Sequence, residues 1–403
     1  MARLELAGLA GDGFGPLDLA AADGELVALL GPGASGKSAL VRVVVGLSGA
    51  HAGTVLLDGQ DATRWAPGER DLAVAFPDAP LYPHLSVRDN LAFGLRLVPV
   101  PEPEVRERVE EIARLLEVRV HLDRSPAQLS AAQRQRVALG RALVRRPAAY
   151  LLDEPLSAQE GGLRTRMRAA VAGVQQAGGT TCLYATASVA DAVGLGGRLA
   201  VLRRGRVEQT GTVAELTQRP ASAYVAALLG ASLVPAAVSQ GSLRLGPAAV
   251  PLPAAALDRL GGREAVLAGV RPDDLAEDAA PDGRVRFPGL VAGSAWTGGE
   301  PLAELRYSGG SAAVLPRLRE DLGEAAAYAA GDRLRARVRS GAGDRRMVTA
   351  LLDPSRVQLF DPDTGAFLTT TAAGEPPGRR PAGQGPAGEG PAGEEPHGEG
   401  PDG

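Results

Sequence analysis

The stretch "GELVALLGPGASGKS", residues 24–38, joins an apolar run to a glycine-rich loop and then to the start of a further apolar segment. The run predicts a buried strand, and the segment from Lys37 to about Val45 predicts a helix. Residues 31–38 fit the pattern G-x-x-x-x-G-K-[ST], in which backbone N–H groups surround phosphates at a helix N-terminus. A glycine-rich turn is the plainer alternative, but the flanking strand and helix favour a phosphate-binding loop.

The predicted loop supplies both a phosphate cradle and a metal ligand. Lys37 would reach the β- and γ-phosphates, and the hydroxyl of Ser38 would ligate Mg²⁺. The predicted phosphate-binding residues are Gly31, Pro32, Gly33, Ala34, Ser35, Gly36, Lys37 and Ser38.

A second motif, "LLDEP" at residues 151–155, ends another apolar strand with two carboxylates. Asp153 suits a metal-bound water, and Glu154 suits the polarisation of an attacking water. A solvated turn is the alternative, which the upstream phosphate loop makes much less favoured. The two motifs together predict a site for ATP and Mg²⁺, with Ser38 and Asp153 at the metal and Glu154 as the catalytic carboxylate.

Strands that alternate with helices up to about Gly230 predict an α/β domain. Residues 103–120 place Val105, Val109, Ile112 and Leu116 on one helical face. Short strand-like pieces among glycines and prolines then predict a small β barrel or sandwich. From Gly374 a repeated Pro-Ala-Gly-Glu/Gln pattern predicts a disordered tail.

Composition excludes several classes of function. A net charge of −4 gives no sign of a nucleic-acid partner. The single cysteine, Cys182, is expected in the core and indicates a reducing compartment. The longest uncharged run, residues 220–243, is broken by glycine and proline and makes a poor membrane span. Any membrane role would therefore require docking onto other subunits.

The order of the motifs resembles that of the ATP-binding subunits of ABC transporters. The phosphate loop, "LYPHLSV" at 81–87, "LSAAQRQRVALGRAL" at 129–143 and "LLDEPLS" at 151–157 carry this resemblance. "GVRPDDL" at 269–275 and "LDPSRVQLFDPDTG" at 352–365 resemble the accessory C-terminal domain of importers of the maltose and sugar-phosphate type. The resemblance implies a P-loop NTPase core with a helical subdomain, followed by an OB-like regulatory domain.

The resemblance also implies an assembly. Residues 1–230 would form the ATP-binding domain, with its helical subdomain at about 78–147; residues 232–370 would form the OB-like domain and 371–403 the tail. Two ATP-binding subunits, identical or different, would sandwich ATP at the cytoplasmic face of the membrane. Their partners would be permease subunits and, indirectly, a solute-binding protein. The residues that would face the partner subunit's phosphate loop are Ser130, Ala131, Ala132 and Gln133.

Several positions depart from the family pattern. Ala131 and Ala132 replace glycines that allow close approach to the γ-phosphate. Pro77 stands in place of a glutamine and Ala187 in place of a histidine, so an amide and an imidazole are missing. Gln159 replaces an apolar residue. Ala34, by the same resemblance, replaces a glycine, and Phe14 is either an adenine-stacking or a core residue.

Three functional alternatives follow from these departures. The first is an importer subunit that binds ATP and hydrolyses it weakly. The second is a weakened paralogue with a structural or regulatory role beside an active partner, and the third is an ordinary fast ATPase. The arginines of "VLRRGR", residues 201–206, are expected on a solvated hairpin. We expect no zinc site at His51 or His121, and no catalytic role for His84.

Overall fold

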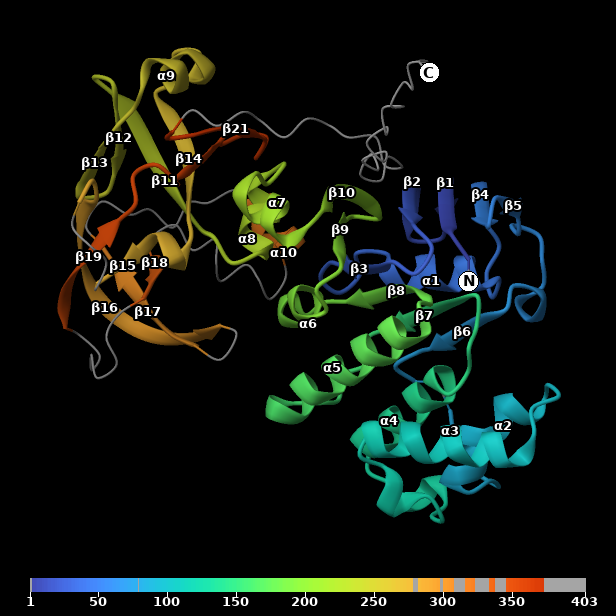
Figure 1. The fold of residues 1–403 in the computed structure, drawn as a ribbon. Coiled ribbons are helices and arrows are strands. Elements are labelled where there is room, and N and C mark those ends of the chain that lie inside the picture. Colours follow the sequence, from blue (N-terminus) through green and yellow to red (C-terminus); the bar gives the residue numbers. More distant parts are fainter. Residues whose placement is uncertain are drawn as a thin grey trace, which may run out of the picture.

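The computed structural model describes residues 2–78, 80–277, 282–297, 300–307, 316–322, 333–337 and 346–372. Figure 1 shows a mixed α/β part, coloured blue to green, beside a part built mainly from strands, coloured yellow to red. The tail predicted from Gly374 lies outside the described residues.

A six-stranded sheet with the order β10-β9-β3-β8-β7-β6 forms the centre of the α/β part. The strands are β3 (Leu26–Leu30), β6 (Leu72–Ala75), β7 (Ala149–Asp153), β8 (Thr181–Thr186), β9 (Arg198–Arg203) and β10 (Arg206–Gly211). All neighbours are parallel except β9 and β10, which form the predicted hairpin. Every residue of β3, β7 and β8 is buried, as expected for parallel strands covered on both faces. The carboxyl ends of these strands meet at one edge, where the predicted site lies.

A second, antiparallel sheet with the order β2-β1-β4-β5 shares a core with one face of the central sheet. Its strands are β1 (Leu4–Gly11), β2 (Phe14–Ala21), β4 (Ala52–Leu57) and β5 (Gln60–Asp61). Helix α1 (Lys37–Val45) contributes Leu40 and Val44 to the same core. Phe14 is 6% exposed within this core, which favours the core role over adenine stacking.

Helices occupy the predicted subdomain range below the central sheet in Figure 1. They are α2 (Val87–Arg96), α3 (Glu102–Leu115) and α4 (Ala131–Leu143), with the short 3₁₀ turns η2 (Arg119–His121) and η3 (Pro126–Gln128) between α3 and α4; a further turn, η1 (Pro67–Glu69), precedes β6. The buried face of α3 carries Val105, Val109 and Ile112, as predicted. This helix ends at Leu115 and not near residue 120, because Glu117 adopts the left-handed conformation with φ 52°.

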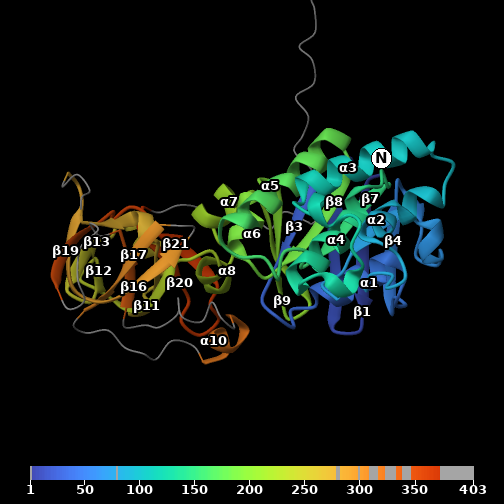
Figure 2. The ribbon, with the colours of Figure 1, turned by 90° about the horizontal axis from the view of Figure 1, so that it is seen from below.

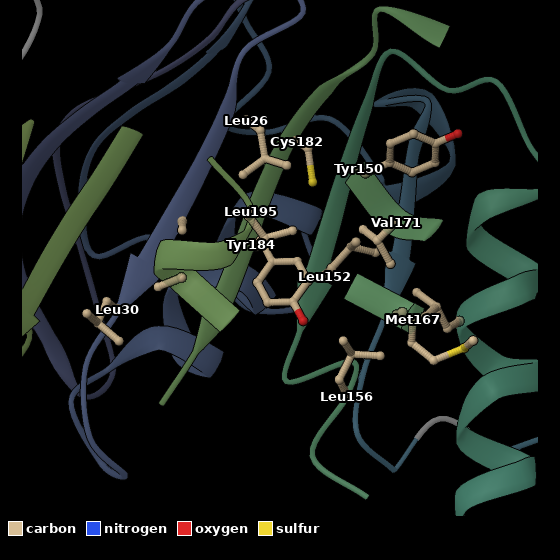
Figure 3. Close-up of a cluster of buried hydrophobic side chains, with 14 of the residues drawn as sticks. Leu26, Leu30, Tyr150, Leu152, Leu156, Met167, Val171, Cys182, Tyr184 and Leu195 are labelled. Carbon is tan, nitrogen blue, oxygen red and sulfur yellow. The ribbon is translucent and has the colours of Figure 1, made fainter. Parts of the chain in front are cut away.

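The other face of the central sheet is closed by α4, α5 and the following helices. The helices after β7 are α5 (Gly161–Gly178), α6 (Val189–Gly194), α7 (Val213–Gln218) and α8 (Ala223–Leu228). Met167 and Val171 of α5 lie in one apolar cluster with Tyr184 and Cys182 of β8 (Figure 3). Cys182 is fully buried, which confirms the predicted core position.

The rest of the described chain forms two antiparallel sheets. Their strands are β11 (Ser232–Ser239), β12 (Ser242–Leu245), β13 (Ala248–Pro251), β14 (Ala265–Val270), β15 (Leu275–Ala276), β16 (Val285–Thr297), β17 (Glu300–Arg306), β18 (Arg333–Ala336), β19 (Met347–Leu352), β20 (Gln358–Phe360) and β21 (Phe367–Thr370). The orders are β13-β12-β11-β14-β20-β21 and β15-β19-β16-β17-β18, around a shared core. The prediction of an α/β core followed by a β-rich region is therefore confirmed. Three short helical segments, α9 (Ala254–Leu260), α10 (Pro316–Leu322) and η4 (Pro272–Asp274), are additions that the sequence patterns did not predict.

The two parts of the chain are joined by packed side chains. Tyr224 and Leu228 of α8 belong to the same apolar cluster as Leu267 of β14 and Phe360 of β20. The backbone N–H of Ala223 also donates to the carbonyl of Gly365, at 2.8 Å. One apolar cluster therefore contains residues from both sides of the boundary expected near residue 230. Within the described residues, no helix has the length and apolar character needed to cross a membrane.

Candidate nucleotide site

The phosphate loop runs from the end of β3 to the start of α1, as the sequence predicts. Two of its three glycines, Gly31 and Gly36, are required by close contacts, whereas a Cβ at Gly33 would meet nothing within 4 Å. A Cβ at Gly31 would lie 2.6 Å from Ser35 Oγ and 2.9 Å from the carbonyl oxygen of Leu202. Gly36 has φ 98°, and a Cβ there would lie 2.9 Å from the carbonyl oxygen of Gly13. The loop therefore fits tightly against β2 and against the end of β9.

Ala34 adopts φ 61°, a left-handed conformation that glycine accepts without strain. The resemblance predicts a glycine at this position. A non-glycine residue held there costs on the order of 1–3 kcal/mol. The alanine therefore stores strain at the exposed turn of the loop.

Lys37 is the buried cation of the site. Its side chain is 5% exposed, and its Nζ donates to the carbonyl oxygens of Gly31 at 2.7 Å and Pro32 at 2.9 Å. Burial lowers the pKa of Lys37, while the nearby carboxylates of Glu154 and Asp153 oppose that shift. The Nζ lies 3.6 Å from Glu154 Oε1. The lysine thus covers the loop and faces Glu154, the carboxylate predicted to polarise the attacking water.

Asp153 and Ser38 lie together. Asp153 is 1% exposed, and its carboxylate accepts a hydrogen bond from the Ser38 hydroxyl. Burial raises the pKa of Asp153, and Lys37 acts in the opposite direction. Among the described residues, Oδ1 of Asp153 is buried without a hydrogen-bond partner. A hydroxyl beside a carboxylate oxygen with free bonding capacity is the hard-oxygen set that Mg²⁺ prefers, so these residues fit the metal.

Glu154 follows Asp153 in a left-handed conformation with φ 46°. Its N–H donates to the carbonyl of Ala185 at 2.9 Å, which fixes the turn at the end of β7. Its carboxylate accepts from the N–H of Ala187 and lies 3.5 Å from the hydroxyl of Thr186. Burial raises the pKa of Glu154, whereas Lys37 lowers it. The acid is thus held at the edge where β7 and β8 end.

The segment that begins with Ser130 starts helix α4. Ser130 is its N-cap: Ser130 Oγ accepts from the N–H of Gln133 at 3.2 Å, and Gln133 Oε1 accepts from the N–H of Ser130 at 2.8 Å. Ala131 is exposed and Ala132 half-buried at the helix start. Among the described residues, no hydrogen bond or ion pair of this segment goes to the phosphate loop of the same chain.

Gln159 has a structural role that the sequence did not indicate. Its side chain is 1% exposed, and Nε2 donates to the carbonyl of Ala132 at 2.9 Å and to Gln135 Oε1 at 3.2 Å. Gln135 Nε2 in turn donates to the carbonyl of Glu154 at 3.1 Å. A chain of amides thus connects the start of α4 with Glu154. The only sequence signal was a polar residue where the family pattern has an apolar one.

The prediction of solvated arginines in the β9–β10 hairpin is wrong for Arg203. Arg203 forms an ion pair with Asp321, 2.7 Å away, and the Asp321 side chain is only 4% exposed. Sequence patterns could not reveal this ion pair, because its partners are more than a hundred residues apart.

Two other positions that depart from the family pattern, Pro77 and Ala187, both lie exposed at the surface.

The fold and this site define a phosphate-loop nucleotide-binding protein. A family model described as "ABC transporter" matches residues 14–157. The sn-glycerol-3-phosphate import ATP-binding protein UgpC of Cereibacter sphaeroides is 41% identical over 302 residues, which cover 74% of this chain and 84% of that protein. The protein of the same name from Rhizobium meliloti is 42% identical over 275 residues, covering 68% and 77%. The chain belongs to the family of ATP-binding subunits of ABC importers.

A solved structure also resembles the chain. It is the dimeric, post-hydrolysis state of the ATP-binding cassette MJ0796 bound to ADP and Pi. The match has a TM-score of 0.48 and 25% sequence identity, and it covers 52% of this chain and 98% of the chain in the solved structure.

Proposed function

We propose that this chain binds ATP and Mg²⁺ through residues 31–38 and uses them to drive import of sn-glycerol 3-phosphate or a related organic phosphate. The observation that supports this proposal most strongly is that four side chains lie together at the phosphate loop: Lys37, Ser38, Asp153 and Glu154. The names of the relatives support the class of solute. The solute itself would be selected by a binding protein and by permease subunits.

Each residue of the site has a separate role at the phosphates. The loop N–H groups and the helix N-terminus attract the phosphates, and Lys37 exchanges its carbonyl contacts for phosphate oxygens. That exchange separates Lys37 from Glu154, whose carboxylate is then free to orient the attacking water. Ser38 and Asp153 would hold Mg²⁺, which neutralises charge on the phosphates when bound.

The assembly is part of the same proposal. Two ATP-binding subunits, identical or different, would pair so that Ser130, Ala131, Ala132 and Gln133 of one contact the nucleotide in the other. The exposed start of α4 suits this role, because Ser130 satisfies the helix cap locally and its surroundings are open. The pair would sit on permease subunits at the cytoplasmic face of the membrane.

Hydrolysis in this proposal is weak. Ala131 and Ala132 add methyl groups where the resemblance places close-approach glycines, and Pro77 lacks a side-chain amide. Ala187 offers its N–H to Glu154 but no imidazole. These positions support a second candidate function, in which the chain holds ATP and acts as a structural or regulatory subunit beside an active partner.

Phosphate release separates the candidates. The assay compares the full chain with the variant Lys37→Ala at saturating ATP and Mg²⁺. Steady release by the wild type above the variant supports the transport-driving function. ATP binding with release equal to that of Lys37→Ala supports the regulatory function. Fast release, at the rate of an ordinary transporter ATPase, would contradict the proposed weakness.

A further inference from the structure

An ion-pair cluster joins α10 to the β9–β10 hairpin. Asp321 Oδ2 accepts from Arg203 Nε at 2.8 Å and Nη2 at 2.7 Å, and Oδ1 accepts from Arg204 Nε at 2.5 Å. The Asp321 side chain is 4% exposed, so both of its oxygens are shielded from water. The Arg203 guanidinium also lies over the ring of Tyr224, 5.0 Å from its centroid. Charge-assisted bonds in such a setting are stronger than surface pairs.

Apolar contacts hold α10 in place beside this cluster. Leu318 is 3% exposed and Leu322 is 1% exposed, and both belong to the cluster that includes Tyr224 and Leu228 of α8. The views in Figures 1 and 2 agree that α10 lies beside α8. The carboxylate of Asp321 is therefore presented by a helix that is itself anchored to the α/β part.

The hairpin that Asp321 binds contacts the phosphate loop at two points. The N–H of Gly205 donates to the carbonyl of Ser35 at 3.0 Å. The carbonyl of Leu202 accepts from the Tyr224 hydroxyl at 2.8 Å, and this oxygen, together with Ser35 Oγ, leaves no room for a Cβ at Gly31. Between these two points, Arg204 adopts a left-handed conformation with φ 48°. A non-glycine residue in this conformation needs support from its surroundings.

We propose that Asp321 is a positioning residue for nucleotide binding: through Arg203 and Arg204 it holds the hairpin against Gly31 and Ser35. The β-rich region thereby sets the shape of the phosphate loop. This inference rests on the proposed ATP site at residues 31–38, and it adds a residue from outside the ATP-binding part to that site.

In this arrangement, docking of α10 and binding of nucleotide are thermodynamically linked. If the docked α10 favours the binding-competent loop, bound nucleotide must favour the docked α10 by the same factor. A partner that pulled on the β-rich region would then change the affinity for ATP. Coupling of this kind typically amounts to about 5–150-fold in affinity.

The test uses the full chain and the substitution Asp321→Asn. Isothermal titration measures the Kd for ATP with Mg²⁺, and hydrogen exchange follows the amide of Gly205. Arg203 keeps a second carboxylate, Glu208, 3.6 Å away, so the hairpin retains one ion pair in the variant. We expect binding to weaken at least about 5-fold and the Gly205 amide to exchange faster. Asp321→Glu, which restores the charge, should recover most of both.

A matched control removes a carboxylate elsewhere in the same region. Asp273 pairs with Arg271 and Arg337, so Asp273→Asn makes an equal charge change away from the hairpin. It should leave both the Kd and the Gly205 exchange unchanged. An effect of Asp273→Asn equal to that of Asp321→Asn would overturn the inference.

Two further outcomes keep the test decisive. If Asp321→Asn lowers stability too far for titration, Arg204→Ala, at a side chain that is 60% exposed, must weaken binding in the same direction. If Asp321→Asn and Arg204→Ala both bind ATP with wild-type affinity, the inference about Asp321 is overturned, while the proposed ATP site is unaffected. Absence of nucleotide binding in the wild type would instead remove the proposed function, and the exchange of Gly205 would still decide whether Asp321 holds the hairpin.

Discussion

Restoring the family residues at the start of α4 and beside Glu154 should raise turnover. The variant combines Ala131→Gly, Ala132→Gly and Ala187→His. Glycine costs up to about 1 kcal/mol relative to alanine within a helix, so the two replacements lower the free energy of unfolding by about 2 kcal/mol at most. The capping pair of Ser130 and Gln133 remains and keeps the helix start in place. Ala187 is exposed, so an imidazole has room there.

The expected gain in turnover follows from the contacts restored. A preorganised donor to developing charge is typically worth about 10²–10³ in turnover. Effects within one composite site do not add fully. We therefore expect at least about a 10-fold gain, equivalent to about 1.4 kcal/mol of transition-state stabilisation. Adding Pro77→Gln should mainly improve coupling to the permease subunits.

The assay is phosphate release by the wild type and the restored protein, each with and without Glu154→Gln. Glu154→Gln should abolish release in both backgrounds, which shows that the rate belongs to this site. A fast wild type that restoration leaves unchanged would refute the proposal of weakened hydrolysis. A slow wild type that restoration also leaves unchanged would place the limiting defect elsewhere, with Ala34 and its left-handed backbone as the first candidate.

Three further predictions concern stability. Because burial raises the pKa of Asp153, its charge destabilises the nucleotide-free protein at neutral pH, and this cost is lost as the pH falls through the raised pKa. Calorimetry of Asp153→Asn should thus show a higher melting temperature than wild type at pH 7 and a smaller difference in acid; a lower value at pH 7 contradicts this. Gln159→Leu should change the free energy of unfolding by less than about 1 kcal/mol, since the two lost hydrogen bonds are offset by removal of a buried orphan oxygen, and Gln135 Oε1 still accepts from the N–H of Ala158; a larger loss in denaturant titration would mean that the amide chain is a main support. A fragment that ends at Gly230 should still bind ATP, at least about 5-fold more weakly because it lacks Asp321, and should melt well below the full chain, because Tyr224 and Leu228 lose their apolar cover; an unchanged melting temperature would show that the two parts are independent.

Local patterns were sufficient to predict much of the fold. The strand, loop and helix at residues 24–45 were predictable because glycine spacing, an apolar run and a helix start follow one another directly. The end of α3 was misplaced, because the left-handed turn at Glu117 leaves no signal in the apolar periodicity.

Long-range contacts account for what the sequence did not reveal. The bonds of Gln159 to Ala132, and of Asp321 to Arg203, join segments that are distant in the chain. Each of these side chains is polar, and its burial depends on a partner that only the folded chain supplies. The candidate site was therefore predictable in its motif residues but not in the contacts that hold those residues in place.

The proposed nucleotide site is tested most directly by titration of MgATP into the full wild-type chain and into Lys37→Ala. Lys37 is the buried cation that faces Glu154, and hydrogen bonds that involve a charged group are worth about 1.5–3 kcal/mol each. We expect saturable binding of MgATP to the wild type and a loss of at least about 10-fold in affinity in the variant, at about 1.4 kcal/mol per tenfold. Equal affinity in the two proteins would contradict the assignment of residues 31–38 as the nucleotide site.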